Sequence, residues 1–567
     1  MEKRLIIAVT LSVLIFLVFG YLQERFAPTP PPEEAKPVAS TPAPTPAPPP
    51  SQVIEPSPAP EIPPLAPATA EPPRDIMVDT PLYHAVFTEP GARLKSFKLK
   101  KYREELPITT IAGFDLWWFN FEIQKYQPAS EQHTVPKELI EISDPAQLPL
   151  AVSWESSTTP ALTAVPYRAS QKSLTIDSQG KGSLTFTQVR PDGLILIKTL
   201  TFRGDTYQIG LNLTVQNQSR QPSAGNLNLS LTADYAKPEV GRYSFQGFVG
   251  FINGSRQEVK SSKLEELKTF TGQIDWASLE DNYFMKAVVP GAGYESILTL
   301  QETSSKIMTA TLKTAMNAIP PGQQATIPYA LYFGPKELSI LKSLGLGLEQ
   351  AVNFGWFNIL AMPLLYVLNF FYRYLHNYGV AIILLTALIR ILFIYPNHKS
   401  YKSMQAMQKL QPKIAKLREK YKDDRETMNK ELMGLYKTYK VNPASGCLPM
   451  LLQLPVFIAL YNILGYAIEM RHAPFIPTLP FTEIVWLADL SVRDPLLITP
   501  VVMGVTMFIQ QKMSPAPGDP TQAKLMLMMP VIFTVMFLNF SSGLVLYWLA
   551  NNVLSIIQQH FTNKYLS

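Results

Sequence analysis

The stretch GVAIILLTALIRILFIY, residues 379–395, has the composition of a membrane-spanning helix, yet it contains one charged side chain, Arg390. An arginine at the middle of a membrane helix costs roughly 2.5–3.5 kcal/mol, so such a residue is a candidate for function. Arg390 could instead extend its side chain to the nearer interface, because at 1.5 Å per residue it is roughly 9 Å from Pro396. Thr386 lies one turn earlier on the same helical face, which favours a hydrated surface around the arginine.

The composition is that of a membrane protein. Of 567 residues, 47% are hydrophobic and 17% are charged, which is unusual for a soluble chain. Residues 1–23 begin with a basic segment and continue as an apolar run of spanning length. A cleaved signal peptide is the alternative, but no A-x-A-like site follows the run, so we expect a retained transmembrane anchor. The sole cysteine, Cys447, excludes an intrachain disulfide and a multi-cysteine metal site.

Two segments of different character follow the anchor. Residues 24–75 are rich in proline and contain few large apolar side chains. This composition cannot build a hydrophobic core and predicts a semi-rigid tether. Residues 76–340 show period-two patterns such as GLILIKTLTF and NLNLSLTADY, which predict a large antiparallel β-sandwich domain. Its two histidines, His84 and His133, are far apart and lack the spacing of a metal site. Nothing in this domain indicates catalysis.

The last part of the chain is rich in apolar and aromatic residues. We predict an amphipathic interfacial helix at 341–376. Five spans follow, which with the anchor make six transmembrane helices: 377–396, 443–468, 495–512, 523–540 and 543–560. The remaining segments are a predicted helical hairpin at 397–442, loops at 469–494 and 513–522, and a tail at 561–567. Ser541 and Ser542 alone separate the last two spans, which should therefore form a tight hairpin.

The basic residues predict the orientation in the membrane. Lys3 and Arg4 precede the first span, which places the N-terminus in the cytoplasm and exports the tether and the β domain. The segment 398–441 carries twelve Lys or Arg and five Asp or Glu, a net charge of 12 − 5 = +7, and is also expected in the cytoplasm. Alternation of the spans then places the C-terminus in the cytoplasm as well.

Within this basic segment, apolar residues repeat every three or four positions on both sides of residues 422–424, which predicts two helices joined by a turn. The repeating residues are Met404, Met407, Leu410, Ile414, Leu417, Tyr421, Met428, Leu432, Leu435 and Tyr439. This seam could be the hairpin's own core, or its methionines could bind other chains. The basic outer faces suit anionic lipid headgroups and, equally, an anionic macromolecule such as ribosomal RNA.

If Arg390 faces the other helices, it needs polar neighbours. The sequence offers neutral groups at a similar depth, and these are Thr386, Gln453, Gln510, Asn551 and Asn552. No carboxylate lies in the interior of the predicted spans, so we expect a hydrated cavity that opens toward the cytoplasm. Each amide taken alone could instead hold two helices together.

Three classes of protein could use such a cavity. A transporter or channel is the main alternative, although it usually needs paired ionisable groups and often an internal repeat. An intramembrane hydrolase needs a nucleophile with a base, yet no histidine lies in the interior of a predicted span. A charged, half-depth groove better suits a non-enzymatic device that shelters a polar segment while a hydrophobic helix enters the lipid. Such a device requires neither a cofactor nor a metal.

Several motifs are specific enough to indicate a family. The runs VNPASGCLPMLLQLPVFIALY (441–461), MGVTMFIQQKMSP (503–515) and SSGLVLYWLANN (541–552) resemble the YidC family of membrane protein insertases, which includes mitochondrial Oxa and chloroplast Albino relatives. YFGPK at 332–336 resembles the Gram-negative branch. The resemblance implies a periplasmic β-supersandwich, a cytoplasmic helical hairpin, and a helical core around a hydrophilic groove with one arginine. Arg390 occupies that position.

The resemblance also implies roles for individual residues. The substrate groove would contain Arg390, Thr386 and Trp548, with Gln510 and Gln453 nearby; Trp548 stands where close relatives often have tyrosine. Incoming helices would slide along Leu454, Phe457, Val531 and Met536, for which lipid contact or packing is the alternative role. We therefore expect a multi-pass inner-membrane insertase and chaperone that works alone or with the Sec translocon. The implied partners are nascent inner-membrane proteins, membrane lipids and the ribosome, which would dock on the cytoplasmic loops because the tail is short.

Overall fold

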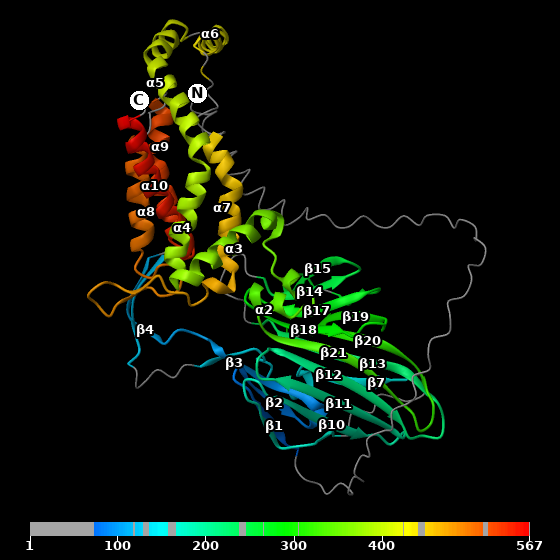
Figure 1. Ribbon diagram of the computed structural model, residues 1–567. Coiled ribbons are helices and arrows are strands. Elements are labelled where there is room, and N and C mark those ends of the chain that lie inside the picture. Colours follow the sequence, from blue (N-terminus) through cyan, green and yellow to red (C-terminus); the bar gives the residue numbers. More distant parts are fainter. Residues whose placement is uncertain are drawn as a thin grey trace, which may run out of the picture. The chain divides into compact units, whose positions relative to one another are not determined.

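The computed structural model describes most of the chain from residue 73 onward (Figure 1). The described ranges are 73–116, 119–128, 135–156, 166–236, 245–264, 266–303, 306–422, 424–439, 441, 448–513 and 520–565. The predicted anchor at 1–23, nearly all of the tether and Cys447 lie outside these ranges.

The period-two pattern folds into an all-β domain with three large sheets. The first has the order β6 (Pro136–Glu138), β3 (Arg93–Arg103), β2 (Tyr83–Thr88), β1 (Asp75–Asp79) and β9 (Ser173–Thr175). The second has the order β15 (Ser255–Lys260), β14 (Gly247–Ile252), β17 (Ile274–Glu280), β18 (Phe284–Pro290), β21 (Gln324–Pro335), β12 (Gln208–Asn217), β11 (Leu194–Arg203), β10 (Lys181–Val189) and β8 (Arg168–Ala169). The third has the order β16 (Lys268–Phe270), β19 (Ser296–Glu302), β20 (Ile307–Ile319), β13 (Ser223–Asp234) and β7 (Ala151–Glu155). The predicted β-sandwich domain is confirmed.

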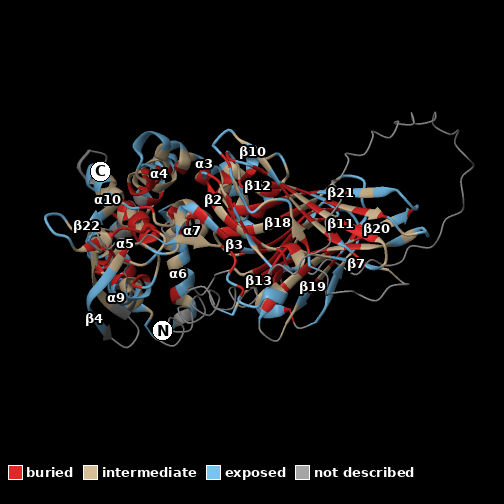
Figure 2. Ribbon diagram, turned by 90° about the horizontal axis from the view of Figure 1, so that it is seen from below, coloured by how far each residue is buried: buried red, intermediate tan, exposed pale blue. Residues whose placement is uncertain are grey.

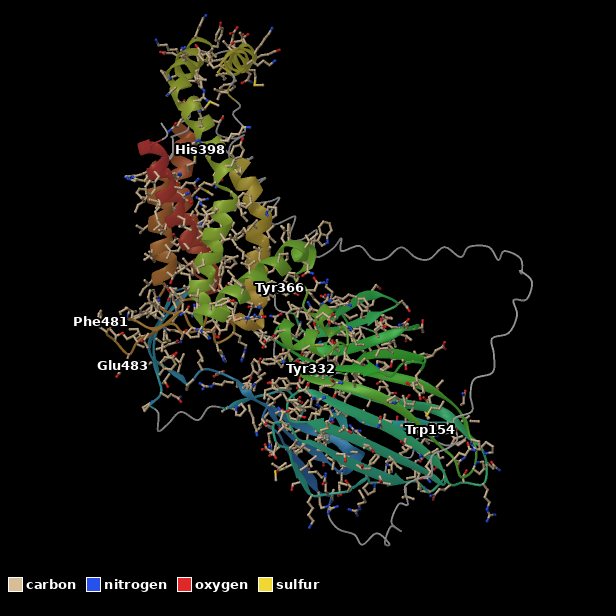
Figure 3. The ribbon with its side chains drawn as sticks, viewed as in Figure 1. Trp154, Tyr332, Tyr366, His398, Phe481 and Glu483 are labelled. Atoms are coloured by element: carbon tan, nitrogen blue, oxygen red, sulfur yellow. The ribbon has the colours of Figure 1, made fainter. Side chains whose placement is uncertain are left out.

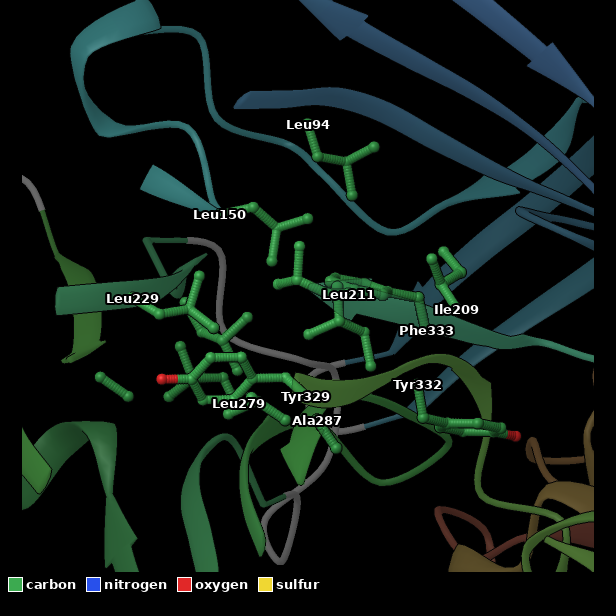
Figure 4. Close-up of a cluster of buried hydrophobic side chains, with 14 of the residues drawn as sticks. Leu94, Leu150, Ile209, Leu211, Leu229, Leu279, Ala287, Tyr329, Tyr332 and Phe333 are labelled. Atoms are coloured by element: carbon green, nitrogen blue, oxygen red, sulfur yellow. The ribbon is translucent and has the colours of Figure 1, made fainter. Parts of the chain in front are cut away.

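One hydrophobic core joins residues of all three sheets (Figure 4). On β12, Ile209 and Leu211 are buried from the same face, as the period of two requires. Leu94 on β3, Leu229 on β13 and Leu279 on β17 belong to the same cluster. Figure 2 shows that buried residues concentrate inside this domain and among the helices.

A lysine is buried inside this core. The Nζ atom of Lys198, on β11, donates hydrogen bonds to the carbonyls of Ala92 at 2.6 Å and Leu150 at 2.7 Å. Both acceptor residues have positive φ angles, 48° and 65°, which is uncommon outside glycine. Burial lowers the pKa of Lys198 to about 7. Because Ala92 directly precedes β3 and Leu150 directly precedes β7, the lysine links the second sheet to the other two.

Two small sheets lie outside the three large ones. β4 (Ile108–Leu116) pairs with β5 (Phe119–Tyr126), and β22 (Ile476–Thr478) pairs with β23 (Val485–Leu487). The second pair belongs to the loop that follows the predicted span at 443–468.

The C-terminal part is helical. Its α-helices are α2 (Leu338–Ser343), α3 (Asn358–Leu375), α4 (Tyr378–Leu392), α5 (Ile394–Lys420), α6 (Arg425–Thr438), α7 (Leu448–Tyr466), α8 (Ile498–Met513), α9 (Pro520–Phe537) and α10 (Ser542–Tyr565). Helix α10 packs against α4, α7 and α8, while α9 packs against α8, and α3 against α4 and α7. Leu365, Leu385, Leu460 and Val545 contribute to the hydrophobic core of these helices.

The predicted span at 377–396 is not one straight helix. Asn377 caps α4, because its side-chain oxygen accepts a hydrogen bond from the backbone N–H of Val380 at 3.1 Å. Helix α4 ends at Leu392, and α5 begins at Ile394 after a bend of 59°. Helices α5 and α6 cover the predicted hairpin, and Asp424 caps α6 through the N–H of Thr427. Leu410, Ile414 and Met428, from the predicted seam, are buried.

Among the described helices, fewer are long and apolar enough to cross a membrane than the sequence analysis predicts. Among the described residues, the segment Gly355–Leu375 is long and apolar enough to cross a membrane by itself, and the bent pair α4 and α5 passes the same test when taken together. The first of these lies in the segment that we predict to be interfacial. Shorter apolar helices occur at Gln453–Tyr466 and Met526–Phe537. The six-span arrangement therefore stays a prediction.

Candidate functional site

Arg390 lies in the last turn of α4, where α10 provides its partner. One terminal nitrogen of the guanidinium, Nη2, donates a hydrogen bond to the hydroxyl of Ser555. The Nε atom is buried and has no hydrogen-bond partner. Within the described ranges, no carboxylate forms an ion pair with Arg390. The arginine therefore keeps a positive charge that only neutral groups contact.

Polar groups on three helices gather next to this arginine. On α7, the side-chain amide of Gln453 donates to the hydroxyl of Tyr547 at 3.0 Å and to the Oδ1 atom of Asn551 at 3.3 Å. Ser555, the partner of Arg390, donates to the carbonyl of Asn551 at 2.7 Å. We name these five residues, Arg390, Gln453, Tyr547, Asn551 and Ser555, the polar cluster. In the structure, Gln453 and Asn551 therefore contact each other, and Ser555 connects Asn551 to the arginine.

Sequence reasoning missed two members of this cluster. Tyr547 and Ser555 were not among the expected neighbours of Arg390, although both contact the cluster in the structure. A signal was present, because Tyr547, Asn551 and Ser555 are spaced four residues apart and therefore share one face of a helix. Asn552 points elsewhere: its amide donates to the Met503 carbonyl on α8 at 3.4 Å.

Two other predicted groove residues have different surroundings. Thr386 is 1% exposed, and its hydroxyl donates to the carbonyl of Ile382 at 2.6 Å, four residues earlier on its own helix. Gln510 lies half-buried in the last turns of α8. Neither is a member of the polar cluster as defined above.

Trp548 belongs to an aromatic cluster instead. Its ring lies 5.0 Å from that of Phe457 on α7, 5.8 Å from Phe533 and 5.2 Å from Phe537 on α9, measured between ring centroids. We name these four residues the aromatic cluster. Phe457, which the resemblance places on the sliding surface, is therefore packed on one side by Trp548.

The other predicted sliding residues are exposed. Leu454 on α7 is 38% exposed, and on α9 Val531 is 65% and Met536 is 46% exposed. Large apolar side chains left open on two helices need lipid or another apolar surface to cover them. The predicted sliding positions thus divide into three exposed side chains and one, Phe457, that is half-buried.

Comparisons with known proteins agree with this arrangement of a β domain and a helical part. Residues 370–567 match the family model described as 60Kd inner membrane protein, and residues 120–367 match the YidC periplasmic domain. A membrane protein insertase YidC from Syntrophus aciditrophicus (strain SB) is 42% identical over 575 residues, which cover all of both chains. The chain belongs to the YidC family. A second YidC, from Citrifermentans bemidjiense, is 42% identical over 577 residues and covers 100% of this chain and 99% of its own.

Membership of the YidC family settles the general activity. The chain is a membrane protein insertase of the inner membrane with a periplasmic domain, and its substrates are nascent membrane proteins. The relatives are named for insertion and not for an enzymatic reaction. The expected family and function are therefore confirmed.

Solved structures resemble the chain only weakly. A crystal structure of an active YidC insertase with its first transmembrane domain resolved is 17% identical, covers 88% of this chain and 94% of its own, and has a TM-score of 0.36. A galactose mutarotase related enzyme from Lactobacillus acidophilus is 10% identical, covers 46% of this chain and 97% of its own, and has a TM-score of 0.29. TM-scores this low establish neither a shared fold nor a shared activity.

Proposed function

We propose that this insertase receives the polar segment of an incoming chain at the polar cluster. The proposal rests on the surroundings of Arg390. Its Nε atom is buried and has no hydrogen-bond partner, while its Nη2 atom donates to a neutral hydroxyl, that of Ser555. A charge in such surroundings needs water or a transient polar ligand. An acidic group 4 Å away would be attracted by about 1 kcal/mol in bulk water and by about 4 kcal/mol at an effective dielectric constant near 20, so a partly hydrated site lies between these limits.

The hydrophobic part of the same substrate would leave along the exposed apolar side chains of α7 and α9. Leu454, Val531 and Met536 are open to contact in the structure. In lipid, helices associate through packing and not through the hydrophobic effect, so a substrate helix can exchange these contacts for lipid at little cost. The surface therefore guides the helix without holding it.

A transporter or channel is the alternative use of this site. In the proposed orientation, the N-terminal end of α10 faces the periplasm, and Trp548 precedes Asn551 by one turn. The aromatic cluster then lies at the level of Tyr547, on the periplasmic side of Asn551 and Ser555. Three phenylalanines packed around Trp548 would close this level of the bundle, so a substrate would reach the polar cluster from the cytoplasmic side. This arrangement favours insertion to half depth over passage of a solute.

Topology and partners complete the proposal. Six spans place both termini and the α5–α6 region in the cytoplasm, where basic side chains on these helices meet headgroups and the ribosome. The substrate first contacts this region and then the polar cluster. The insertase works alone or beside the Sec translocon, and it also acts as a chaperone for inner-membrane proteins. It needs no bound cofactor.

Site-specific photocrosslinking to a stalled nascent membrane protein tests the proposal. A photoreactive amino acid at Leu454 or Met536 should crosslink to the hydrophobic segment of the substrate, because both side chains are exposed. Thr386 and Trp548 are more enclosed and should crosslink less, with products only when the groove opens for substrate. Exposed Leu267, in the β domain, is the matched control. Equal crosslinking from Leu267, Leu454 and Met536 would contradict the proposal.

A further inference from the structure

The β4–β5 hairpin stands apart from the three large sheets of the β domain. Its two strands form a sheet of their own, and an isolated bridge joins Lys125 of β5 to Ile484, the residue directly before β23. A two-stranded hairpin is marginally stable in water at best. This hairpin therefore needs an additional surface to stabilise it.

The strand register gives the hairpin two unlike faces. Phe114 on β4 lies opposite Phe121 on β5, and Ile123 follows two positions later on the same face. Glu122 and Gln124 alternate with these residues and point to the opposite face, where the amide of Gln124 donates to the carboxylate of Glu122 at 2.7 Å. One face of the hairpin is thus aromatic and aliphatic, while the other is polar.

The polar face is already occupied. The carboxylate of Glu122 pairs with Arg493 at 2.9 Å, and the backbone N–H of Glu122 donates to the carbonyl of Pro495 at 3.0 Å. The apolar face is open at β4, where Phe114 is 66% exposed and Ile111, at the bulge of the same strand, is 56% exposed, while Phe121 and Ile123 on β5 are half-buried. What covers the apolar face must itself be apolar.

The contact with Pro495 locates the hairpin along the membrane normal. Pro495 precedes the start of α8 by three residues. The backbone N–H of Leu497 donates to the carbonyl of Asp494 at 3.2 Å, so the chain turns here and spans less than the roughly 10 Å of three extended residues. The headgroup layer on each side of a bilayer is roughly 5–8 Å thick. If α8 crosses the membrane, Phe114 therefore lies at the level of the periplasmic headgroups.

A second exposed aromatic side chain lies in the same loop. Phe481, between β22 and β23, is fully exposed (Figure 3). Two residues later, Glu483 pairs with Lys125 of β5 at 3.1 Å. Aromatic side chains concentrate at membrane interfaces, where their rings contact both headgroups and acyl chains. An exposed ring at this level costs free energy in water and gains it in the interface.

We propose that the apolar face of the β4–β5 hairpin, together with Phe481, inserts into the periplasmic leaflet of the lipid bilayer and anchors the β domain at the membrane surface. The partner is the lipid interface itself, recognised by aromatic and aliphatic side chains and not by a particular headgroup. The proposal rests on the proposed crossing of the membrane by α8. It adds to the proposed spans a second attachment of the periplasmic domain to the membrane.

Depth-dependent quenching in proteoliposomes tests this anchor. The full chain with Cys447→Ser carries a fluorophore at Phe114→Cys or at Phe481→Cys, and lipids with a nitroxide near the headgroup act as quenchers. Both positions should be quenched at least about twofold more than two controls, because only an interfacial ring lies near the nitroxide. The controls are Gln124→Cys, on the polar face of the same hairpin, and Leu267→Cys, an exposed apolar position elsewhere in the β domain.

Each remaining outcome has a defined meaning. Quenching at Phe114→Cys equal to that at Gln124→Cys overturns the anchor. A fluorophore at Val505→Cys, an exposed position on α8, reports the crossing separately through nitroxides deep in the acyl chains. If Val505→Cys is quenched and Phe114→Cys is not, α8 crosses the membrane and the proposed hairpin anchor alone is wrong. If Val505→Cys is not quenched, α8 does not cross the membrane, and the proposed location of the hairpin is wrong as well. Crosslinking between Phe114→Cys residues of two copies, in place of quenching, would assign the face to a second copy and overturn the lipid partner.

Discussion

At the scale of the residue, the positive charge of Arg390 should matter more than its shape. Arg390→Lys keeps the charge but not the fork of the guanidinium, so it should retain much of the activity. Arg390→Ala and Arg390→Glu should impair insertion of substrates with acidic translocated segments, by an amount on the order of 1–3 kcal/mol, because they lose one attraction in a partly hydrated site. The measurement is protease-protected substrate in proteoliposomes across a series of substrate charges.

Ser555→Ala is the matched control for that series. It removes the hydroxyl that contacts Arg390 and leaves the charge in place, so insertion of acidic substrates should fall less than in Arg390→Ala. If Arg390→Ala inserts acidic substrates as well as the unmodified chain does, the Arg390 side chain only extends to the membrane interface, and its charge has no role in insertion.

A second prediction at this scale concerns Glu469, in the loop that follows α7. Burial raises the pKa of its carboxyl group from 4.5 to about 7, and the amide of Asn369 lies 3.4 Å from its Oε1 atom. A raised pKa means that the folded state favours the protonated acid. The stabilisation is complete below pH 4.5 and is lost as the pH rises through about 7. The melting temperature should therefore fall as the pH rises from 4.5 to about 7.

Glu469→Gln should flatten this pH dependence, because an amide does not titrate. Glu483→Gln, an exposed acid in the same loop, should leave it unchanged. Thermal unfolding of the full chain in detergent at several pH values measures both effects. An unchanged slope in Glu469→Gln would show that another group titrates.

At the scale of the element, the contact of α8 with α9 depends on a glycine. A Cβ atom at Gly504 would collide with the hydroxyl of Thr534, which donates to the Pro530 carbonyl at 2.7 Å. Gly504→Ala should therefore destabilise the helical part by about 1–3 kcal/mol, as overpacking does.

Gly465→Ala on α7 is the control, since nothing lies within 4 Å of its Cβ position. That change should stabilise by roughly 0.5–1 kcal/mol. Unfolding titrations in mixed detergent measure the difference, and equal effects of both changes would refute the close approach.

At the scale of the whole molecule, the arrangement across the membrane can be tested with protease. Protease added to spheroplasts should digest the β domain and spare α5 and α6, because six spans place these on opposite sides. Lysed cells serve as the control, in which α5 and α6 should also be cut. Cleavage within α5 or α6 in intact spheroplasts would refute the proposed topology.

Only part of the site could be predicted, because a periodic sequence pattern describes one helix at a time. The pattern shows which residues share a face of one helix, so Arg390, Gln453 and Asn551 were expected near one another at similar depth. It does not show which helix that face meets. For this reason Ser555 and Tyr547 were missed, and Trp548 was expected beside the arginine although it packs against Phe457 and two phenylalanines of α9.

Composition and periodicity were sufficient to predict an all-β domain and a helical membrane part with one arginine, and specific sequence runs carried the resemblance to the family, because all of these depend on local order along the chain. Tertiary structure alone decided three other features: the neutral partners of Arg390, the carbonyls that hold Lys198, and the contact of the β4–β5 hairpin with residues 493–495. Each of these joins residues that are far apart in sequence. Such contacts are chosen by the packing of whole elements, which no local pattern encodes.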